Sequence, residues 1–254
     1  MAHIFDLLIV AGTAILSVRL FATGLRRRYR VFFYYLIFAT LQAGVAACLT
    51  PGGRAYQKFY VLTEPLQWLF YVLVVLEIYA LVLQDYRGLS TVGRWALITA
   101  VLVAVLASGM SLMAPSQFSQ SRVMTFYYVA ERAVYFSLLV FLLSIHGLLL
   151  QYPITLSRNI IVHSMVFSVY FLGNTVLYLL LSMSGSGYMP VVVSAVPLIT
   201  LAAIGAWLVR LNPAGETRKL RLRPEWMPGR EEVLVSQLNN LNAALLRATR
   251  NRPK

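Results

Sequence analysis

The sequence is poor in cysteine, in charged residues and in recognisable catalytic motifs. Cys48 is its only thiol, which excludes an internal disulfide and a cluster of thiolate metal ligands. It has no glycine-rich phosphate loop, no paired-histidine metalloprotease helix and no Gly-x-Ser-x-Gly elbow. No lysine falls in any of the long apolar runs described next, so a retinal Schiff base has no attachment point. We therefore expect neither an enzyme nor a resident cofactor.

Long apolar runs dominate what is present. Hydrophobic residues make up 59% of the chain and charged residues only 12%, a balance far from that of a soluble domain. Each run is close to the ~20 residues that cross a bilayer as a helix, and the runs cover residues 3–24, 31–50, 60–84, 94–114, 123–149, 159–184 and 189–209. No basic segment precedes the first run, so we expect a retained helix rather than a signal peptide. The sequence predicts an all-α integral membrane protein, built as a seven-transmembrane-helix bundle.

Basic residues are distributed unequally between the two sides of these runs. Most of the 22 lysines and arginines lie in the joints after the first, third and fifth runs and in the tail, whereas the alternate joints hold only Arg54, Lys58 and Arg122. By the positive-inside rule the N-terminus is outside, the C-terminus is inside, and the protein lies in the cytoplasmic (inner) membrane. Topology and attraction to anionic inner-leaflet lipid then account for the net charge of +13, so we expect no nucleic-acid partner.

The composition changes after the last apolar run. Residues 212–230 form a basic juxtamembrane linker that prolines and glycines interrupt. Residues 231–254 are predicted to form a cytoplasmic amphipathic helix or short coiled coil, because leucines recur at spacings of 4, 3 and 4 at Leu234, Leu238, Leu241 and Leu245. Two interpretations stay open. The helix packs on the membrane or on the protein's own loops, or it forms a homodimer or binds a cytoplasmic signalling partner.

Polar residues recur at helical spacing inside several apolar runs. In the run 159–184 they form one stripe with spacings of 7, 4 and 4, made of His163, Tyr170, Asn174 and Tyr178. Two further stripes are formed by Glu64, Gln67 and Tyr71 and by Glu131 and Tyr135. An ionisable residue in hydrocarbon costs at least ~2.5 to 3.5 kcal/mol, so it needs a partner or a watery cavity. Hydrogen bonding between helices explains any single stripe, but an interior pocket explains the set better.

Glu64 and Glu131 occupy the same position in a weak internal sequence repeat. The motif Phe-Tyr-x-x-x-Glu ends at Glu64 and recurs 67 residues later, ending at Glu131; a true duplication and a chance similarity both stay open. Both carboxyls are expected in the outer half, where either Arg132 bridges them or one is protonated. Pro65 can leave a carbonyl free in the preceding turn. We predict an outward-opening site for a cationic or amphipathic small molecule, lined by Glu64, Gln67, Tyr71, Glu131, Arg132, Tyr135, Tyr170, Asn174 and Tyr178.

Two histidines are weak candidates for cofactor ligation. His146 and His163 are expected at similar depth on adjacent helices, where a pair of imidazoles can hold haem iron or a metal ion. No carboxylate or third histidine stands at ligand spacing, so capping or hydrogen bonding is the preferred interpretation. We predict no metal site.

Three hypotheses about function follow from these patterns. The leading one is a sensor or receptor-like module that binds a small molecule from the outer side and signals through its cytoplasmic tail. The alternative is a small-solute or proton-coupled transporter or channel component. The third, a haem-binding or other membrane enzyme, depends on the two histidines alone.

Overall fold

The computed structural model describes residues 2–50, 53–84, 86–110, 122–152, 154–184, 189–220 and 230–250. Most of them belong to long helices, which are α1 (Ala2–Ala22), α2 (Arg30–Cys48), α3 (Arg54–Val82), α4 (Arg87–Met110), α5 (Arg122–Gln151), α6 (Arg158–Ser184), α7 (Met189–Arg210) and α9 (Arg230–Arg250). The short elements are η1 (Leu25–Arg27), α8 (Ala214–Thr217) and a pair of two-residue strands, β1 (Leu156–Ser157) and β2 (Lys219–Leu220). The predicted all-α class is confirmed. Parts of the predicted fourth run, linker and tail lie outside the described residues, namely 111–114, 221–229 and 251–254.

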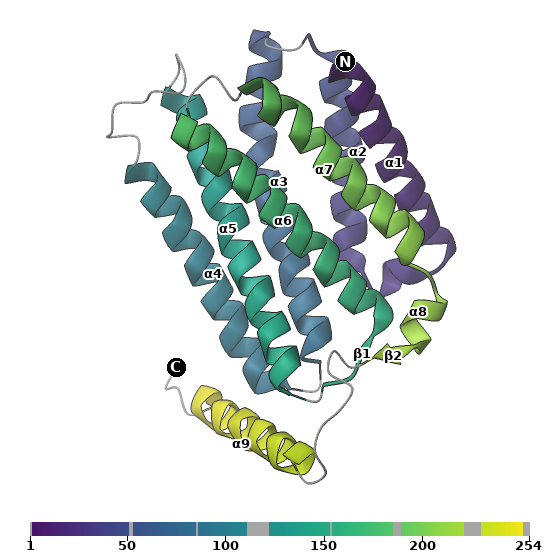
Figure 1. Cartoon of the computed structure of the whole chain (residues 1–254), viewed down its shortest axis with the longest axis vertical. Coiled ribbons are helices and arrows are strands. Elements are labelled where there is room, and N and C mark those ends of the chain that lie inside the picture. The colour runs from purple at the N-terminus through teal and green to yellow at the C-terminus, as the bar shows by residue number, and fades with distance from the viewer. Residues whose placement is uncertain are drawn as a thin grey trace.

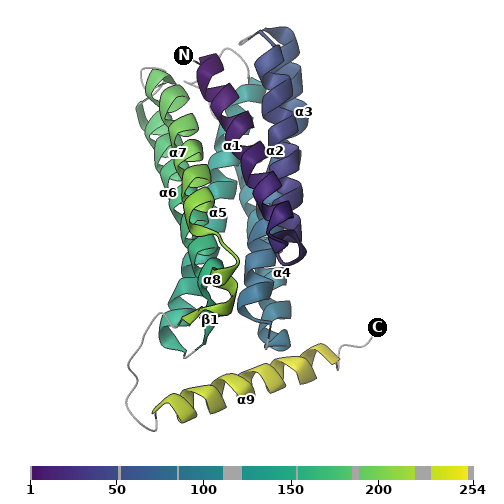
Figure 2. The ribbon, with the colours of Figure 1, turned by 90° about the vertical axis from the view of Figure 1, so that its right-hand side faces the viewer.

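The helices α1 to α7 lie side by side and form one bundle (Figures 1 and 2). Consecutive helices run in opposite directions, and α1 also packs against α7. Helix α3 contacts α2, α4, α5 and α6, so it occupies the middle of the bundle. We call the end of the bundle that holds the N-terminus the N-terminal end. The opposite end, across which α9 lies, we call the tail end.

Six of these helices are long and apolar enough to cross a membrane. They are Ile4–Ala22, Arg30–Cys48, Arg54–Val82, Val129–Gln151, Arg158–Leu181 and Pro190–Arg210. Within the described residues α4 contributes a shorter apolar helix, Gly93–Val103. Large apolar side chains lie exposed on the outside of the bundle, among them Leu62 at 78% and Val169 at 68% exposure, as a lipid environment allows. The chain is therefore a multi-pass membrane protein.

The first part of the predicted linker forms regular structure, namely α8 and β2. Leu156 of β1 pairs with Leu220 of β2 in an antiparallel register, which ties the α5–α6 joint to the chain after α7. The backbone N–H of Arg158 donates to the carbonyl of Arg218 at 2.9 Å and extends this pairing. The linker therefore begins as part of the folded tail end, because backbone pairing with the α5–α6 joint is available there.

Helix α9 docks on α4 through part of the predicted leucine seam. Leu238 is buried, Leu245 packs against the core, and the backbone N–H of Gly88 donates to Asn242 Oδ1 at 2.7 Å. Leu241, on the edge of the same seam, is exposed. This packing matches the interpretation in which the tail helix packs on the protein itself. A homodimer or signalling partner at the seam stays a prediction.

Candidate ligand-binding site

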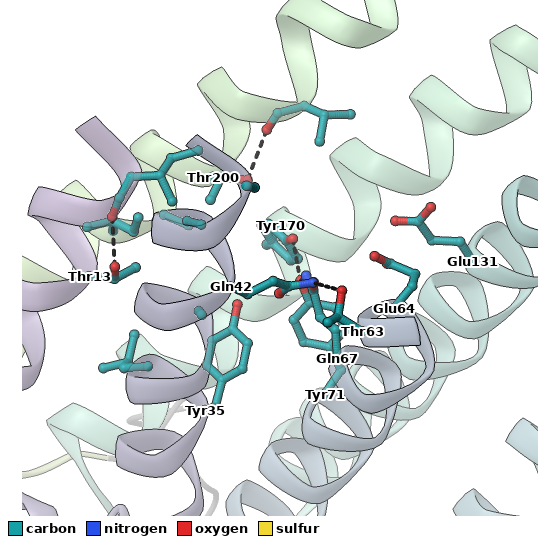
Figure 3. A pocket seen from close by; sticks show the side chains of 18 of the residues that line it. Thr13, Tyr35, Gln42, Thr63, Glu64, Gln67, Tyr71, Glu131, Tyr170 and Thr200 are labelled. Carbon is teal, nitrogen blue, oxygen red and sulfur yellow. Dashed lines mark hydrogen bonds between the residues drawn. The ribbon is translucent and has the colours of Figure 1, made fainter. Parts of the chain in front are cut away.

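A cavity of about 250 Å³ lies between α1, α2, α3, α5, α6 and α7 (Figure 3). It extends from Ala46 in the last turn of α2 and Tyr56 in the first turn of α3, near the N-terminal end, to Trp207 in the last turn of α7. Its volume lies just below the roughly 300–1,000 Å³ typical of ligand pockets, which suits a small ligand. Aromatic rings form much of its wall, from Tyr35, Tyr56, Phe59, Tyr60, Tyr71, Tyr135, Tyr170, Tyr178 and Trp207.

Most of the predicted site residues line this cavity. The structure brings together Glu64, Gln67, Tyr71, Glu131, Tyr135, Tyr170 and Tyr178. The spacings of 3, 4, 4 and 8 residues on α3, α5 and α6 keep these side chains on the inward faces of their helices. Helical periodicity was therefore sufficient to identify the polar walls that these three helices contribute.

Glu131 is buried, and tyrosines of three helices donate hydrogen bonds to its carboxyl. Tyr135 Oη donates to its Oε1 at 2.8 Å and Tyr60 Oη to its Oε2 at 3.3 Å. Tyr178 from α6 also hydrogen-bonds this carboxyl. All these donors are neutral, so they orient the carboxyl without compensating a negative charge.

Glu64 is equally buried, on the neighbouring helix α3. Its Oε1 accepts a hydrogen bond from Trp68 Nε1, one turn further along, at 3.2 Å. Figure 3 shows the carboxyl groups of Glu64 and Glu131 next to each other at one side of the cavity. Each residue is only 3% exposed. Among the described residues that line the cavity there is no lysine, arginine or histidine.

Tyrosine side chains join α3 to α6 beside the carboxyls. Gln67 Nε2 donates to Tyr71 Oη at 2.5 Å, and Tyr71 Oη lies 2.7 Å from Tyr170 Oη. The ring of Tyr71 also packs against that of Tyr135 on α5, with 5.6 Å between centroids. These contacts fix the wall of the cavity through hydrogen bonds and ring packing together.

Pro65 supplies an acceptor as the sequence predicted, but a neighbouring helix uses it. A proline has no N–H to donate to the carbonyl four residues earlier, which here is that of Val61. Tyr127 Oη from α5 donates to this carbonyl at 2.9 Å. The proline next to Glu64 therefore creates a hydrogen bond between α3 and α5.

Two predicted site residues do not line the cavity. Arg132 follows Glu131 and lies about 100° further around α5, and it is not among the partners that stabilise either carboxyl. Asn174 is fully buried, and its Nδ2 donates to the carbonyl of Tyr170 at 2.8 Å. The helical position of Arg132 directs its side chain away from the line that joins the two carboxyls, and its bridging role stays a prediction. The amide of Asn174 bonds its own helix, and its role at the site stays a prediction as well.

Helices α1, α2 and α7 add lining residues that the prediction missed. Gln42 Nε2 on α2 donates to Thr63 Oγ1 on α3 at 3.0 Å. Thr40 Oγ1 on α2 donates to Thr13 Oγ1 on α1 at 2.9 Å. The other α2 residues at the cavity are mostly small, since Ala39, Ala43 and Ala46 line it. Small residues leave space for a cavity but give no polar pattern in the sequence, so this part of the wall could not be predicted.

The two histidines have different surroundings and do not form a pair. His146 Nδ1 lies 2.8 Å from the carbonyl of Leu142, and Ser164 Oγ lies 3.3 Å from its Nε2. His163 is fully buried among aromatic rings, with centroids 4.4 Å away at Phe32 and 5.0 Å away at Phe167. No group of three metal-binding side chains occurs among the described residues.

A second polar cluster lies at the tail end and was not predicted. We define the tail-end cluster as Arg28, Tyr29, Asn159 and Glu216. Tyr29 Oη donates to Glu216 Oε1 at 2.5 Å, Asn159 Nδ2 donates to the same oxygen at 2.9 Å, and Arg28 Nε lies 3.0 Å from Glu216 Oε2. Burial raises the pKa of Tyr29 above its ordinary value, and the hydrogen bond to Glu216 raises it further. The cluster therefore joins the α1–α2 joint, the start of α6 and α8.

The carboxyl of Glu77 on α3 caps the start of α2. Its Oε1 accepts the backbone N–H of Val31 at 2.8 Å and its Oε2 accepts that of Phe32 at 3.0 Å. A helix N-terminus carries a partial positive charge, so this carboxylate is compensated where it lies.

Comparisons of this chain with protein-family models, with curated proteins and with solved structures found no match. Function is therefore argued from the geometry of the cavity and the tail end.

Proposed function

We propose that the protein is a receptor-like membrane sensor, which binds a small molecule in the cavity and signals through its C-terminal tail. The cavity itself carries this proposal, because it combines a ligand-sized volume with polar walls from six helices. A helix bundle with a purely structural role requires neither a cavity of this size nor two buried carboxyl groups.

A continuous set of packed aromatic rings connects the cavity with the tail end. Trp207 lines the cavity and lies 4.9 Å from Phe32 between ring centroids. Phe32 lies 4.4 Å from His163, which lies 5.4 Å from Tyr29 of the tail-end cluster. Tyr29 in turn bonds Glu216 in α8, directly before the chain continues toward α9. Close-packed contacts of this kind can transmit a small displacement.

A cavity-blocking variant provides the test of ligand binding. Ala43→Phe places a ring in the cavity, and Val45→Phe, on the exposed face of α2, is its matched control. We expect a compound screen by thermal stability to yield molecules that stabilise the wild type and Val45→Phe but leave Ala43→Phe unchanged. Such a molecule should change hydrogen exchange in residues 230–250. The absence of any compound that distinguishes the two variants would contradict a binding site.

The topology that we propose has seven spanning helices in the cytoplasmic (inner) membrane, with the N-terminus outside and the tail inside. Support comes from the arrangement of the basic joints, since η1, β1 and β2 all lie at the tail end with α9. Helix α4 lies alongside α5 in the bundle, which supports counting it as a span. Cys48, the last residue of α2, is exposed and can report which side of the membrane this end of the bundle faces. A membrane-impermeant maleimide should label Cys48 in intact cells. The double variant Cys48→Ser, Ser236→Cys should react only after the cells are permeabilised.

The second candidate, a transporter, is favoured by one observation. Neighbouring buried carboxyls inside a membrane are typical of ion and proton pathways. A protein that lacks residues 231–254 should lose signalling if it is a sensor, and it should keep solute flux in vesicles if it is a transporter. Proton-coupled uptake by this truncated protein would replace the sensor proposal with the transporter.

A further inference from the structure

We propose that the ligand of this cavity is a small organic cation, held with its charged nitrogen at Glu64 and Glu131 and its apolar part against the tyrosine rings. This inference rests on the proposed function and specifies the chemical class of the ligand. It follows from charge compensation, ring composition and cavity size, which are independent features of the site.

Charge compensation distinguishes these two carboxyls from others in the same bundle. Glu216 lies 3.0 Å from the guanidinium of Arg28, and Glu77 accepts two backbone N–H groups at the start of α2. Glu64 and Glu131 instead accept hydrogen bonds from neutral indole and phenol groups. Two carboxylates that are close together in a medium of low dielectric constant repel each other, and a cation bound between them offsets both charges. At the tail end Arg28 supplies the positive charge beside Glu216. In the cavity the ligand would supply the positive charge beside Glu64 and Glu131.

The aromatic wall favours an organic ammonium over other cations. The faces of tyrosine rings attract a cation within about 6 Å of the ring centroid, and clusters of such rings are typical of alkylammonium sites. Tyrosines from α2, α3, α5 and α6 line the cavity around the carboxyls. Their hydroxyl groups already donate to Glu131 or bond one another, as in the pair of Tyr71 and Tyr170. The rings also pack against one another, as Tyr71 does against Tyr135, and together they form the wall that the apolar part of a ligand would contact.

A metal ion fits the site less well than an organic cation. Calcium takes six to eight oxygen ligands at about 2.3–2.6 Å, and structural zinc takes four ligands. The described residues contain no group of three side chains that could hold a metal ion. A cavity of about 250 Å³ is also far larger than a bare ion requires. Both observations favour a molecule over an ion.

Three probes of similar shape and different charge test the inference. They are benzyltrimethylammonium, which is permanently cationic, 2-methyl-1-phenylpropan-2-ol, a neutral alcohol, and 2,2-dimethyl-3-phenylpropanoate, which is anionic. Trp68 donates to Glu64 and Trp207 lines the cavity, so the intrinsic tryptophan fluorescence of the purified protein reports binding. We expect the cation to bind at least about tenfold more tightly than the alcohol, and the anion not to bind, since contacts of a cation with carboxylates and ring faces are worth at least that factor.

Isosteric variants identify the groups responsible. Glu64→Gln and Glu131→Gln should each weaken binding of the cation by about tenfold and leave binding of the alcohol unchanged. Glu77→Gln removes a carboxyl from the same helix as Glu64 but outside the cavity, and it should keep the preference for the cation. Equal binding of cation and alcohol, with no effect of Glu64→Gln or Glu131→Gln, would overturn the inference and leave the proposed cavity function standing. Failure of all three probes to distinguish the wild type from Ala43→Phe would contradict both.

The wild-type protein offers a second measurement if a glutamine variant does not fold. A hydrophobic carbodiimide modifies carboxyl groups inside membranes, and the modified residue can be located by mass spectrometry. Benzyltrimethylammonium should protect Glu64 and Glu131 from modification and should not protect Glu77. Unchanged modification of both cavity carboxyls at a saturating concentration of the cation would overturn the proposal.

Discussion

The cavity and the tail-end cluster both hold largely buried carboxyl groups that accept hydrogen bonds from tyrosine, but they differ in charge and in space. Glu216 at the tail end contacts Arg28, Tyr29 and Asn159, and Arg28 supplies a positive charge. Glu64 and Glu131 have neutral partners and an adjoining cavity of about 250 Å³. The comparison teaches that a buried carboxyl by itself does not identify a binding site. What identifies one is a pair of carboxyls without a cationic partner next to a cavity.

The two regions also differ in how the chain builds them. The cavity is built from residues within helices, spaced by helical turns. The tail-end cluster is built from joints and helix ends that are distant in the sequence, where 187 residues separate Tyr29 from Glu216. A cluster of the second kind fastens segments together, so its removal should affect stability more than binding.

The largest expected effect is on the tail-end cluster. Glu216→Ala removes the acceptor of the Tyr29 hydroxyl and one of the two acceptors of the Asn159 amide, whose other acceptor is the carbonyl of Asn212. Each buried unsatisfied group costs about 1–3 kcal/mol. We expect a loss of about 2–4 kcal/mol in the free energy of unfolding, measured by denaturant titration in detergent. A loss below about 0.5 kcal/mol would show that the cluster does not fasten the tail end.

Gly215→Ala should have a somewhat smaller effect at the same place. A Cβ at Gly215 would overlap the side chain of Asn159, so the substitution displaces a member of the tail-end cluster. We expect a loss of about 1–3 kcal/mol in thermal unfolding experiments, as is usual for overpacking. The matched control is Gly205→Ala on α7, where a Cβ meets nothing within 4 Å and alanine favours the helix. Equal effects at the two glycines would contradict the close packing.

The cavity carboxyls should respond with the opposite sign in the protein without ligand. Glu64→Gln or Glu131→Gln keeps the size of the side chain and replaces an ionisable group that has no cationic partner with a neutral one. We expect stability to be unchanged or raised by up to about 1 kcal/mol, measured in the same titration as Glu216→Ala. Destabilisation as large as that of Glu216→Ala would mean that the two regions serve the same structural purpose.

The smallest expected effect is a dependence on alkaline pH at the tail end. The pKa of Tyr29 is raised in the folded protein by burial and then by Glu216, above its ordinary value of 10.0. Above pH 10 the unfolded chain loses this proton while the folded protein keeps it, so the contribution to stability is complete below that pH and declines as pH rises. The decline is about 0.8 kcal/mol at pH 10.5. Tyr29→Phe should lose that part of the pH dependence relative to the wild type, and identical alkaline profiles would contradict the assignment.

Sequence periodicity predicted the cavity walls on α3, α5 and α6 because polar side chains stand out at turns of an apolar helix. Glu64 and Glu131 could be placed together from their shared motif and direction. The wall from α2 could not be predicted, because Ala39, Ala43 and Ala46 resemble any other lipid-compatible residues.

The tail-end cluster could not be predicted for a different reason. Its partners, Arg28, Asn159 and Glu216, have no common spacing, and they meet only because β1 pairs with β2 and α7 returns the chain to the α5–α6 joint. Arg132 shows the converse situation, since a residue adjacent to Glu131 in the sequence lies on another face of α5.

Pro65 has a consequence for how the two cavity carboxyls stay level with each other. Pro65 frees the carbonyl of Val61 in α3, and Tyr127 of α5 donates a hydrogen bond to it. Val61 lies three residues before Glu64, and Tyr127 lies four residues before Glu131. Helices in a membrane can slide past one another in steps of a turn, about 5.4 Å. One such step would separate the carboxyls, and the hydrogen bond to Tyr127 disfavours it. The N–H that Pro65 lacks thus helps to fix the alignment of α3 and α5 along their axes. That alignment keeps Glu64 and Glu131 close enough for one cation to contact both.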